Sequence, residues 1–422
     1  MASNRREFLK ASLGAATLVS FSPAVPSFLS RSVAAAAGRS DGRDTVLVVV
    51  QLSGGNDGLN TVVPYHDETY AKSRPTLRMP PDEVHKIDSD LGFHPRMGAF
   101  MRLYQEGLLS VVQGVGHPNN DRDHNGAMRD WHTARPGEAA CQTGWLGRTI
   151  DGLFRTDEGN VPGVFVGPIA QPFGLNAERA IVPSVRSLQQ WRLQAMPGPG
   201  GQTHRRQLVE AAKSPREGES SPLLKFVQQS TLAAYAGSEQ IETVARAGTS
   251  AEAAGYPGFS LARDFHTVAQ LIRADVGIRV YFTELGGGGI GGFDNHANQL
   301  GNHCAVLHQL SESVAAFVDD LVRDKLADRV LLMTFSEFGR TVAENGRRGT
   351  DHGAAAPVFL AGGRLKSGLI GPHPSLTDLD NGAQKFHTDF RRVYATVLDR
   401  WLGLDSQTVL GEKYEPLDVL RV

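Results

Sequence analysis

The sequence is poor in cysteine, in aromatic residues and in long apolar runs. It holds two cysteines in 422 residues, and aromatic residues make up 7%. Two cysteines permit at most one disulfide, so a fold stapled by disulfides is excluded. The low aromatic content and the 47 glycines favour many strand-to-loop turns over a helical bundle. Hydrophobic (41%) and charged (21%) residues occur at globular levels, which excludes a disordered chain.

The chain also lacks a large excess of positive or negative charge. The formal net charge is −2, and the body of the chain has no run of Lys or Arg, so we expect no nucleic-acid partner. After the first 37 residues no apolar run reaches about 18 residues, so we expect no stable membrane span there.

The first 37 residues resemble an export signal. Arg5 and Arg6 precede Phe-Leu-Lys, a mildly apolar stretch follows over 11–29, and a small-residue site suited to signal peptidase ends at Ala37. Prolines inside the apolar stretch make a poor spanning helix. This pattern predicts a twin-arginine signal peptide over 1–37, with the twin-arginine translocation machinery as an export partner and a periplasmic or secreted location. Its removal takes away four basic residues and one acidic residue, which changes the net charge from −2 to −5.

The rest of the chain, 38–422, reads as one α/β domain. Short apolar runs rich in Val, Ile, Leu and Phe predict buried strands over 45–52, 108–115, 163–166, 278–285, 329–335 and 357–360. Helical patterns lie between them over 95–106, 260–276, 304–327 and 389–402. Alternating strands and helices predict a doubly wound, mostly parallel sheet with helices on both faces. Residues 197–258, rich in Pro, Gly and Ser, predict a partly helical insertion.

Polar side chains gather where three predicted strands end. The carboxyl ends of strands are where ligands collect in open α/β sheets, and the residues there are Asp57, Asp294, His296, Asp351 and His352. If the three strands are neighbours, these residues meet at one edge. Carboxylates and imidazoles together are ligands of zinc, manganese or iron, so a metal site is predicted.

Two alternatives to a metal site stay open: the Asp-His pairs could be ordinary ion pairs or loop hydrogen bonds, and the glycine run could bind a dinucleotide. A single Asp-His pair is more often an ion pair or a loop hydrogen bond than a metal site. Asp351 and His352 can reach one ion only from a tight turn, which Gly349 and Gly353 permit. The glycine run at 286–291 fits a dinucleotide motif, but no matching helix start follows, so an oxidoreductase is disfavoured.

Three further side chains are candidates at this edge. His124 suits donation to a phosphoryl or sulfuryl oxygen, or orientation of Asp123. Arg340 suits bidentate binding of a tetrahedral anion, or an ion pair with Glu337. Glu337 could instead orient a ligand histidine.

The chain resembles the DUF1501 family over nearly its whole mature length. Five stretches carry the resemblance: LSGGNDGLN at 52–60, GFDNHANQ at 292–299, SEFGRT at 336–341, GTDHG at 349–353 and TDFRRVY at 388–394. That family resembles a branch of the alkaline phosphatase and sulfatase superfamily, whose core is a doubly wound α/β sheet. The resemblance implies hydrolysis of phosphate or sulfate esters with one or two divalent metal ions, the metal being zinc, manganese, magnesium, calcium or iron.

The same resemblance implies a ligand set. Asp57, Asp351 and His352 would hold one metal together with a nucleophile near residue 123, and Asp294, His296 and His387 would hold the other. Family members often have Arg-Ser-His-Phe where this chain has Arg-Asp-His-Asn at 122–125. Asp123 cannot form a serine phosphoester, although it could ligate metal, act as a general base or form an acyl-phosphate. The segment at Cys141 does not match a formylglycine sulfatase motif.

These observations predict an exported, metal-dependent hydrolase of phosphate or sulfate esters, acting on a small-molecule or polymer-borne anionic ester. Asp123, His124 and Arg340 are the candidate catalytic residues. The alternative is a binding or assembly protein on the same scaffold, which has lost catalysis at residue 123.

Overall fold

The computed structural model describes residues 45–154, 161–168, 170–185, 251–286 and 292–421. The predicted export signal lies outside the described residues, and so do most of the predicted insertion and the glycines at 287–291. Within these ranges no helix combines the length and the apolar character that a membrane crossing needs.

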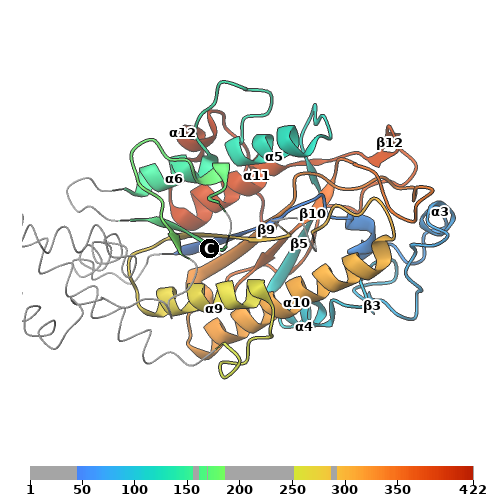
Figure 1. Cartoon of the computed structure of the whole chain (residues 1–422), viewed down its shortest axis with the longest axis horizontal. Helices are drawn as coiled ribbons and strands as arrows, with labels where there is room; N and C mark the ends of the chain where they lie inside the picture. Colours follow the sequence, from blue (N-terminus) through green and yellow to red (C-terminus); the bar gives the residue numbers. More distant parts are fainter. Residues whose placement is uncertain (1–44, 155–160, 169, 186–250, 287–291, 422) are drawn as a thin grey trace, which may run out of the picture.

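A central sheet of nine strands organises the described chain (Figure 1). Its hydrogen-bonded order is β11-β5-β10-β9-β1-β8-β6-β7, and β14 also pairs with β5. The strands are β1 (Val46–Leu52), β5 (Leu109–Gly116), β6 (Gly163–Val166), β7 (Ser184–Val185), β8 (Val280–Leu285), β9 (Val330–Phe335), β10 (Ala356–Ala361), β11 (Gly368–Ile370) and β14 (Thr388–Asp389). Pairing is parallel throughout, except that β10 runs antiparallel to β5 and β9. The predicted mostly parallel α/β sheet is confirmed.

Helices cover both faces of the sheet. On one face lie α4 (Gly98–Gln105), α9 (Ser260–Arg273) and α10 (Gln299–Arg323), and on the other lie α5 (His124–Thr133), α6 (Trp145–Leu153), α11 (Phe390–Ala395) and α12 (Ser406–Leu410) (Figure 1). Strand β1 shows why. Val48 and Val50 belong to the core under α9 and α10, whereas Leu47 and Val49 belong to the core under α6 and α11. Alternate residues of a strand point to opposite faces, so an unbroken apolar run requires cover on both sides.

Small elements complete the described structure. Strands β2 (Val62–Val63), β3 (His85–Lys86) and β4 (Gly92–Phe93) form a separate sheet beside helix α3 (Glu68–Ser73). Strands β12 (Leu379–Asp380) and β13 (Ala383–Gln384) form a hairpin.

All four predicted helices differ from the observed ones, α4 and α9 by at most three residues at either end and the other two by more. Helix α10 begins at Gln299, five residues before the predicted start, because its first turn is polar and lacks the apolar spacing on which the prediction relied. The predicted helix over 389–402 is α11 followed by seven residues of π-helix, Thr396–Leu402. A single apolar periodicity does not distinguish these two windings.

Candidate metal centre

The sheet order brings the polar strand ends together. Strand β1 lies between β8 and β9 and is parallel to both, so the loops that follow all three leave the same edge. The predicted neighbourhood of these strands is therefore confirmed. Helix α5 begins at the same edge and contributes its first residue, His124.

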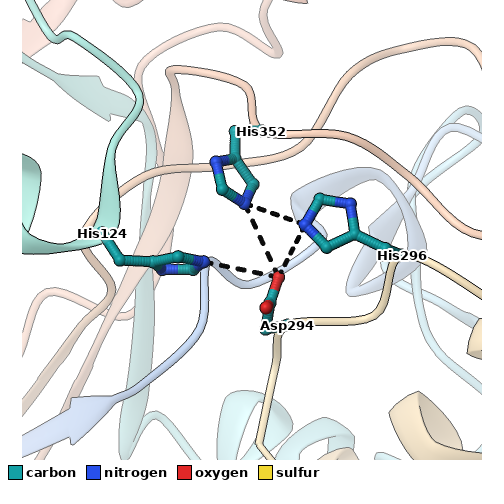
Figure 2. Close-up of side chains that lie close together, drawn as sticks. All are labelled: His124, Asp294, His296 and His352. Atoms are coloured by element: carbon teal, nitrogen blue, oxygen red, sulfur yellow. Dashed lines mark hydrogen bonds and ion pairs between the residues drawn. The ribbon is translucent and has the colours of Figure 1, made fainter.

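Four side chains converge there: His124, Asp294, His296 and His352 (Figure 2). Their ligand atoms all lie within 4.8 Å of one another, and within the described ranges no other group of three or more His, Cys, Asp or Glu side chains comes as close. The Oδ1 atom of Asp294 lies 3.4 Å from Nε2 of His124, 3.0 Å from Nε2 of His296 and 3.6 Å from Nε2 of His352. The side chain of Asp294 is 46% exposed, so the group opens to solvent.

Each histidine is held by its other ring nitrogen. Nδ1 of His124 lies 2.9 Å from Oε1 of Glu337, and Nδ1 of His296 lies 3.2 Å from Oδ1 of Asp351. Nδ1 of His352 lies 2.6 Å from the main-chain oxygen of residue 122. Carboxylate and carbonyl oxygens accept hydrogen bonds, so each Nδ1 donates one, and the Nε2 atom of each ring faces the centre, where it can bind a cation when it carries no proton. This is the usual arrangement of histidines that ligate a metal.

The converging lone pairs call for a cation. Nε2 of His296 and Nε2 of His352 are 2.9 Å apart, so either one ring donates a hydrogen bond to the other or a cation binds both lone pairs. Nε2 of His124 is buried and has no hydrogen-bond partner. Tetrahedral zinc, with bonds of about 2.0–2.1 Å, separates its ligand atoms by about 3.3 Å, which is close to the distances observed here. Three imidazoles and one carboxylate therefore fit a divalent metal ion.

Arg340 joins the loops that carry the group. Its guanidinium donates to main-chain oxygens of Gly54, Gly55, Phe293 and Thr350, and it bonds Oδ1 of Asp294 at 2.6 Å. The side chain has no exposed area. In this structure Arg340 fixes the positions of three loops and has no surface that could contact a substrate anion.

Two glycines allow the loops to approach one another. A Cβ at Gly349 would lie 2.2 Å from the carbonyl carbon of His296, and a Cβ at Gly353 would lie 2.5 Å from that of Arg340. Neither glycine has a positive φ. The sequence analysis expected them to permit a tight turn, and the structure shows that they permit close main-chain contact instead.

Burial and hydrogen bonding shift the ionisation of the group. Burial opposes the charge on Asp294, but the hydrogen bond and charge of Arg340 outweigh it and lower the pKa of Asp294. The hydrogen bond to Glu337 raises the pKa of His124, whereas burial lowers that of His352. The carboxylate of Asp294 is thus ready to bind a cation.

Asp57, predicted as a metal ligand, lies apart from the group. It is 2% exposed, and both of its oxygens bond the guanidinium of Arg74, at 2.6 and 2.9 Å. Gln299 also donates to it. Burial opposes the charge on Asp57, but the charge and hydrogen bond of Arg74, together with His303 and the hydrogen bond of Gln299, outweigh it and lower the pKa of Asp57. An arginine therefore supplies the positive charge that the sequence analysis assigned to a metal.

The other predicted residues also take separate places. His387 lies with its Nε2 2.9 Å from the main-chain oxygen of Pro372 and is not part of the group. Asp351 contacts the group through His296. Asp123 is the N-cap of α5, where its Oδ2 accepts from the main-chain N–H groups of the second and third residues of the helix.

Sequence reasoning found all four members of the group as candidates, and it proposed Glu337 as a residue that orients a histidine. Two partners were not predicted: the main-chain oxygen of residue 122, which contacts His352, and buried Arg74, which pairs with Asp57. Main-chain acceptors and partners that are distant in the chain leave no local sequence pattern.

Comparisons with known proteins give one family and several distant structural resemblances. Residues 44–413 match the model of a family described as "Protein of unknown function (DUF1501)". A search of curated proteins found no match. The chain resembles the solved structure of the lipoteichoic acid synthase LtaP from Listeria monocytogenes, with 8% sequence identity and a TM-score of 0.37. The matched region covers 78% of this chain and 68% of that chain.

Two further structures are similar at the same level. One is an alkaline phosphatase superfamily protein from Vibrio parahaemolyticus, with 11% identity, TM-score 0.34, and coverage of 88% of this chain and 72% of that chain. The other is the C-terminal periplasmic domain of EcEptC from Escherichia coli in complex with Zn, with 9% identity, TM-score 0.34, and coverage of 76% and 74%.

Proposed function

The chain belongs to the DUF1501 family, and we propose that it is a metal-dependent hydrolase of phosphate or sulfate esters. The observation that carries the proposal is the convergence of three Nε2 lone pairs on one carboxylate oxygen at the carboxyl edge of the sheet. In this proposal His124, Asp294, His296 and His352 hold one divalent cation, and a cation that takes a further ligand beside these four would supply Lewis acidity toward an anionic ester.

The charges around the group support an anionic substrate only when a cation is present. Glu337, Asp351 and Asp294 place carboxylates at the site, and the one guanidinium that bonds a member of the group, that of Arg340, is buried. A tetrahedral anion would be repelled by these carboxylates alone. The chain's own residues orient the three imidazoles, and Asp294 leaves the group open to solvent.

The attacking group in this proposal is water. Asp123 uses Oδ2 to cap α5, and this bond places His124 at the first position of the helix. Serine could fill the same role, because Ser and Asp are both good N-caps. Asp123 is therefore proposed as a positioning residue, and Arg340 as the residue that holds Asp294.

We also propose that the protein is exported through the twin-arginine pathway and acts in the periplasm or outside the cell. Arg5 and Arg6 and the small-residue site before residue 38 support this.

The proposal is tested with phosphate and sulfate monoesters of p-nitrophenol. The purified protein is assayed with zinc, manganese, magnesium, calcium or iron in turn. We expect turnover with at least one of these metals, and a loss of about 100-fold or more in His296→Ala. The matched control is His308→Ala on the exposed side of α10, which is expected to keep wild-type activity.

The alternative function is a binding or assembly protein that keeps the metal site without turnover. The capping role of Asp123 favours it, because the structure then offers no side-chain nucleophile at residue 123. Metal-loaded, folded protein without activity on either ester would support this alternative and contradict the hydrolase.

A further inference from the structure

Arg122 holds an unusual main-chain conformation next to the metal centre. Its φ is 59°, in the left-handed region, which costs an L residue about 1–2 kcal/mol. Such a conformation persists when the surroundings fix it. Its N–H donates to Oδ1 of Asn120 at 2.8 Å, and its carbonyl oxygen accepts from Nδ1 of His352 at 2.6 Å.

The side chain of Arg122 is anchored on the hairpin β12–β13. Nη2 donates to the main-chain oxygen and to Oδ2 of Asp380, both at 2.8 Å, and Nη1 donates to the main-chain oxygen of Asn381 at 3.2 Å. Three acceptors on one turn restrain the guanidinium, which is 19% exposed.

The hairpin has a tight turn and is tied to the site. Its two turn residues, Asn381 and Gly382, both have positive φ (47° and 79°), as a tight two-residue hairpin turn requires. Val342 donates its N–H to the oxygen of Gly382 at 2.9 Å, and Thr341 forms a bridge with Ala383. These contacts hold the hairpin against the segment that follows Arg340.

We propose that Arg122 is a positioning residue for His352, and that the hairpin β12–β13 fixes Arg122 through its guanidinium. A fixed carbonyl oxygen keeps the proton of His352 on Nδ1 and aims the Nε2 lone pair at Asp294. The role of this lone pair toward a cation rests on the proposed function. The geometry of the ring does not, and it is measurable without any metal.

Two variants separate this role from general stability. In Arg122→Gly the left-handed φ carries no strain, the side chain with its guanidinium is lost, and the main chain gains freedom, so Gly382→Ala is needed to test the hairpin with Arg122 in place. In Gly382→Ala nothing that touches His352 is removed, but a Cβ is strained at φ 79° in the hairpin turn. Arg122→Lys keeps a cation facing Asp380 and is the conservative variant. Arg102→Ala removes a partly exposed arginine that pairs with Asp319 on α10 and is the matched control.

The first measurement is NMR of the imidazole nitrogens in metal-free protein. We expect wild type to show His352 as a single tautomer with the proton on Nδ1. Arg122→Gly and Gly382→Ala should show a mixture of tautomers, Arg122→Lys should recover the wild-type signal in part, and Arg102→Ala should leave it unchanged. A single Nδ1–H tautomer in Arg122→Gly would overturn the proposal.

The second measurement is cobalt binding followed by the visible spectrum. We expect Kd for Co²⁺ to rise about 10–100-fold in Arg122→Gly, with altered bands, since loss of a residue that orients a ligand has this effect. An unchanged Kd and spectrum, with only a lower Tm, would assign Arg122 a merely structural role and contradict the proposal. Failure of wild type to bind cobalt would instead contradict the proposed function, and the tautomer measurement would still decide the role of Arg122.

Discussion

At the scale of single residues, the buried pair of Arg74 and Asp57 separates the observed site from the expected one. Arg74 is completely buried and bonds Asp57, Asn60 and two main-chain oxygens. A buried carboxylate needs an opposite charge within the fold, and here a side chain provides it.

Replacement of Arg74 should therefore cost much more stability than replacement of an exposed arginine. Arg74→Met leaves the carboxylate of Asp57 buried with only Gln299 as a donor, so we expect a loss of about 3–5 kcal/mol in the free energy of unfolding. Arg102→Met, at a side chain that is 41% exposed, should cost about 1 kcal/mol or less. Urea denaturation of both variants measures this. Equal losses would contradict the account of the Asp57 site.

Asp264 makes the stability of the protein depend on pH. It is 9% exposed on α9, with the hydroxyl of Thr283 3.4 Å away, and burial raises its pKa to about 7. The protonated form is thus favoured in the folded state. Its stabilising contribution is complete below about pH 4, where the unfolded chain is also protonated, and is lost as the pH rises through 7.

Asp264→Asn removes this dependence. Between pH 5 and pH 8 wild type should lose about 2–3 kcal/mol of unfolding free energy more than the variant does. Urea denaturation at both pH values measures the difference, and the exposed Asp82→Asn should behave like wild type. A variant that loses as much stability as wild type over this range would show that Asp264 is ionised in the folded protein at pH 5.

At the scale of elements, the start of α5 links sequence to site. Asp123 caps the helix, and the next residue, His124, points into the metal centre. A change at residue 123 therefore tests whether the carboxylate of Asp123 takes part in the reaction or only positions His124.

Asp123→Ser keeps an N-cap, so it should fold, bind metal and hydrolyse esters within about fivefold of wild type. Asp123→Ala should lose about 0.5–2 kcal/mol of stability through the missing cap. Steady-state kinetics and thermal unfolding measure these effects. A loss of about 100-fold or more in kcat for Asp123→Ser, with metal still bound, would show that the carboxylate takes part in the reaction.

Six strands of the central sheet were predictable from sequence because each is a short, mostly apolar run, whereas β7, β11 and β14, of two or three residues each, were not predicted. β6 matches its predicted bounds, and β1, β5, β8, β9 and β10 match theirs to within two residues at each end. The candidate ligands were predictable because they follow such strands. Their grouping was not. Whether Asp57 meets a metal or Arg74 depends on a partner in another element, and no local pattern encodes that choice.

At the scale of the whole molecule, parallel strands deliver loops that are distant in the chain to one edge. His124, Asp294 and His352 are separated by 170 and 58 positions, and Arg340 holds the loops around them in register. The group thus forms only in the folded chain, and a cation bound there would stabilise that state, by about 2.7 kcal/mol at a concentration 100 times Kd.

The most direct test is the metal content of the purified protein after equilibration with divalent cations and removal of the excess. The account predicts about one equivalent per chain, which is lost in His296→Ala and kept in His308→Ala. Folded wild-type protein that retains no metal, or that retains it equally in both variants, would contradict the assignment of His124, Asp294, His296 and His352 as a metal centre.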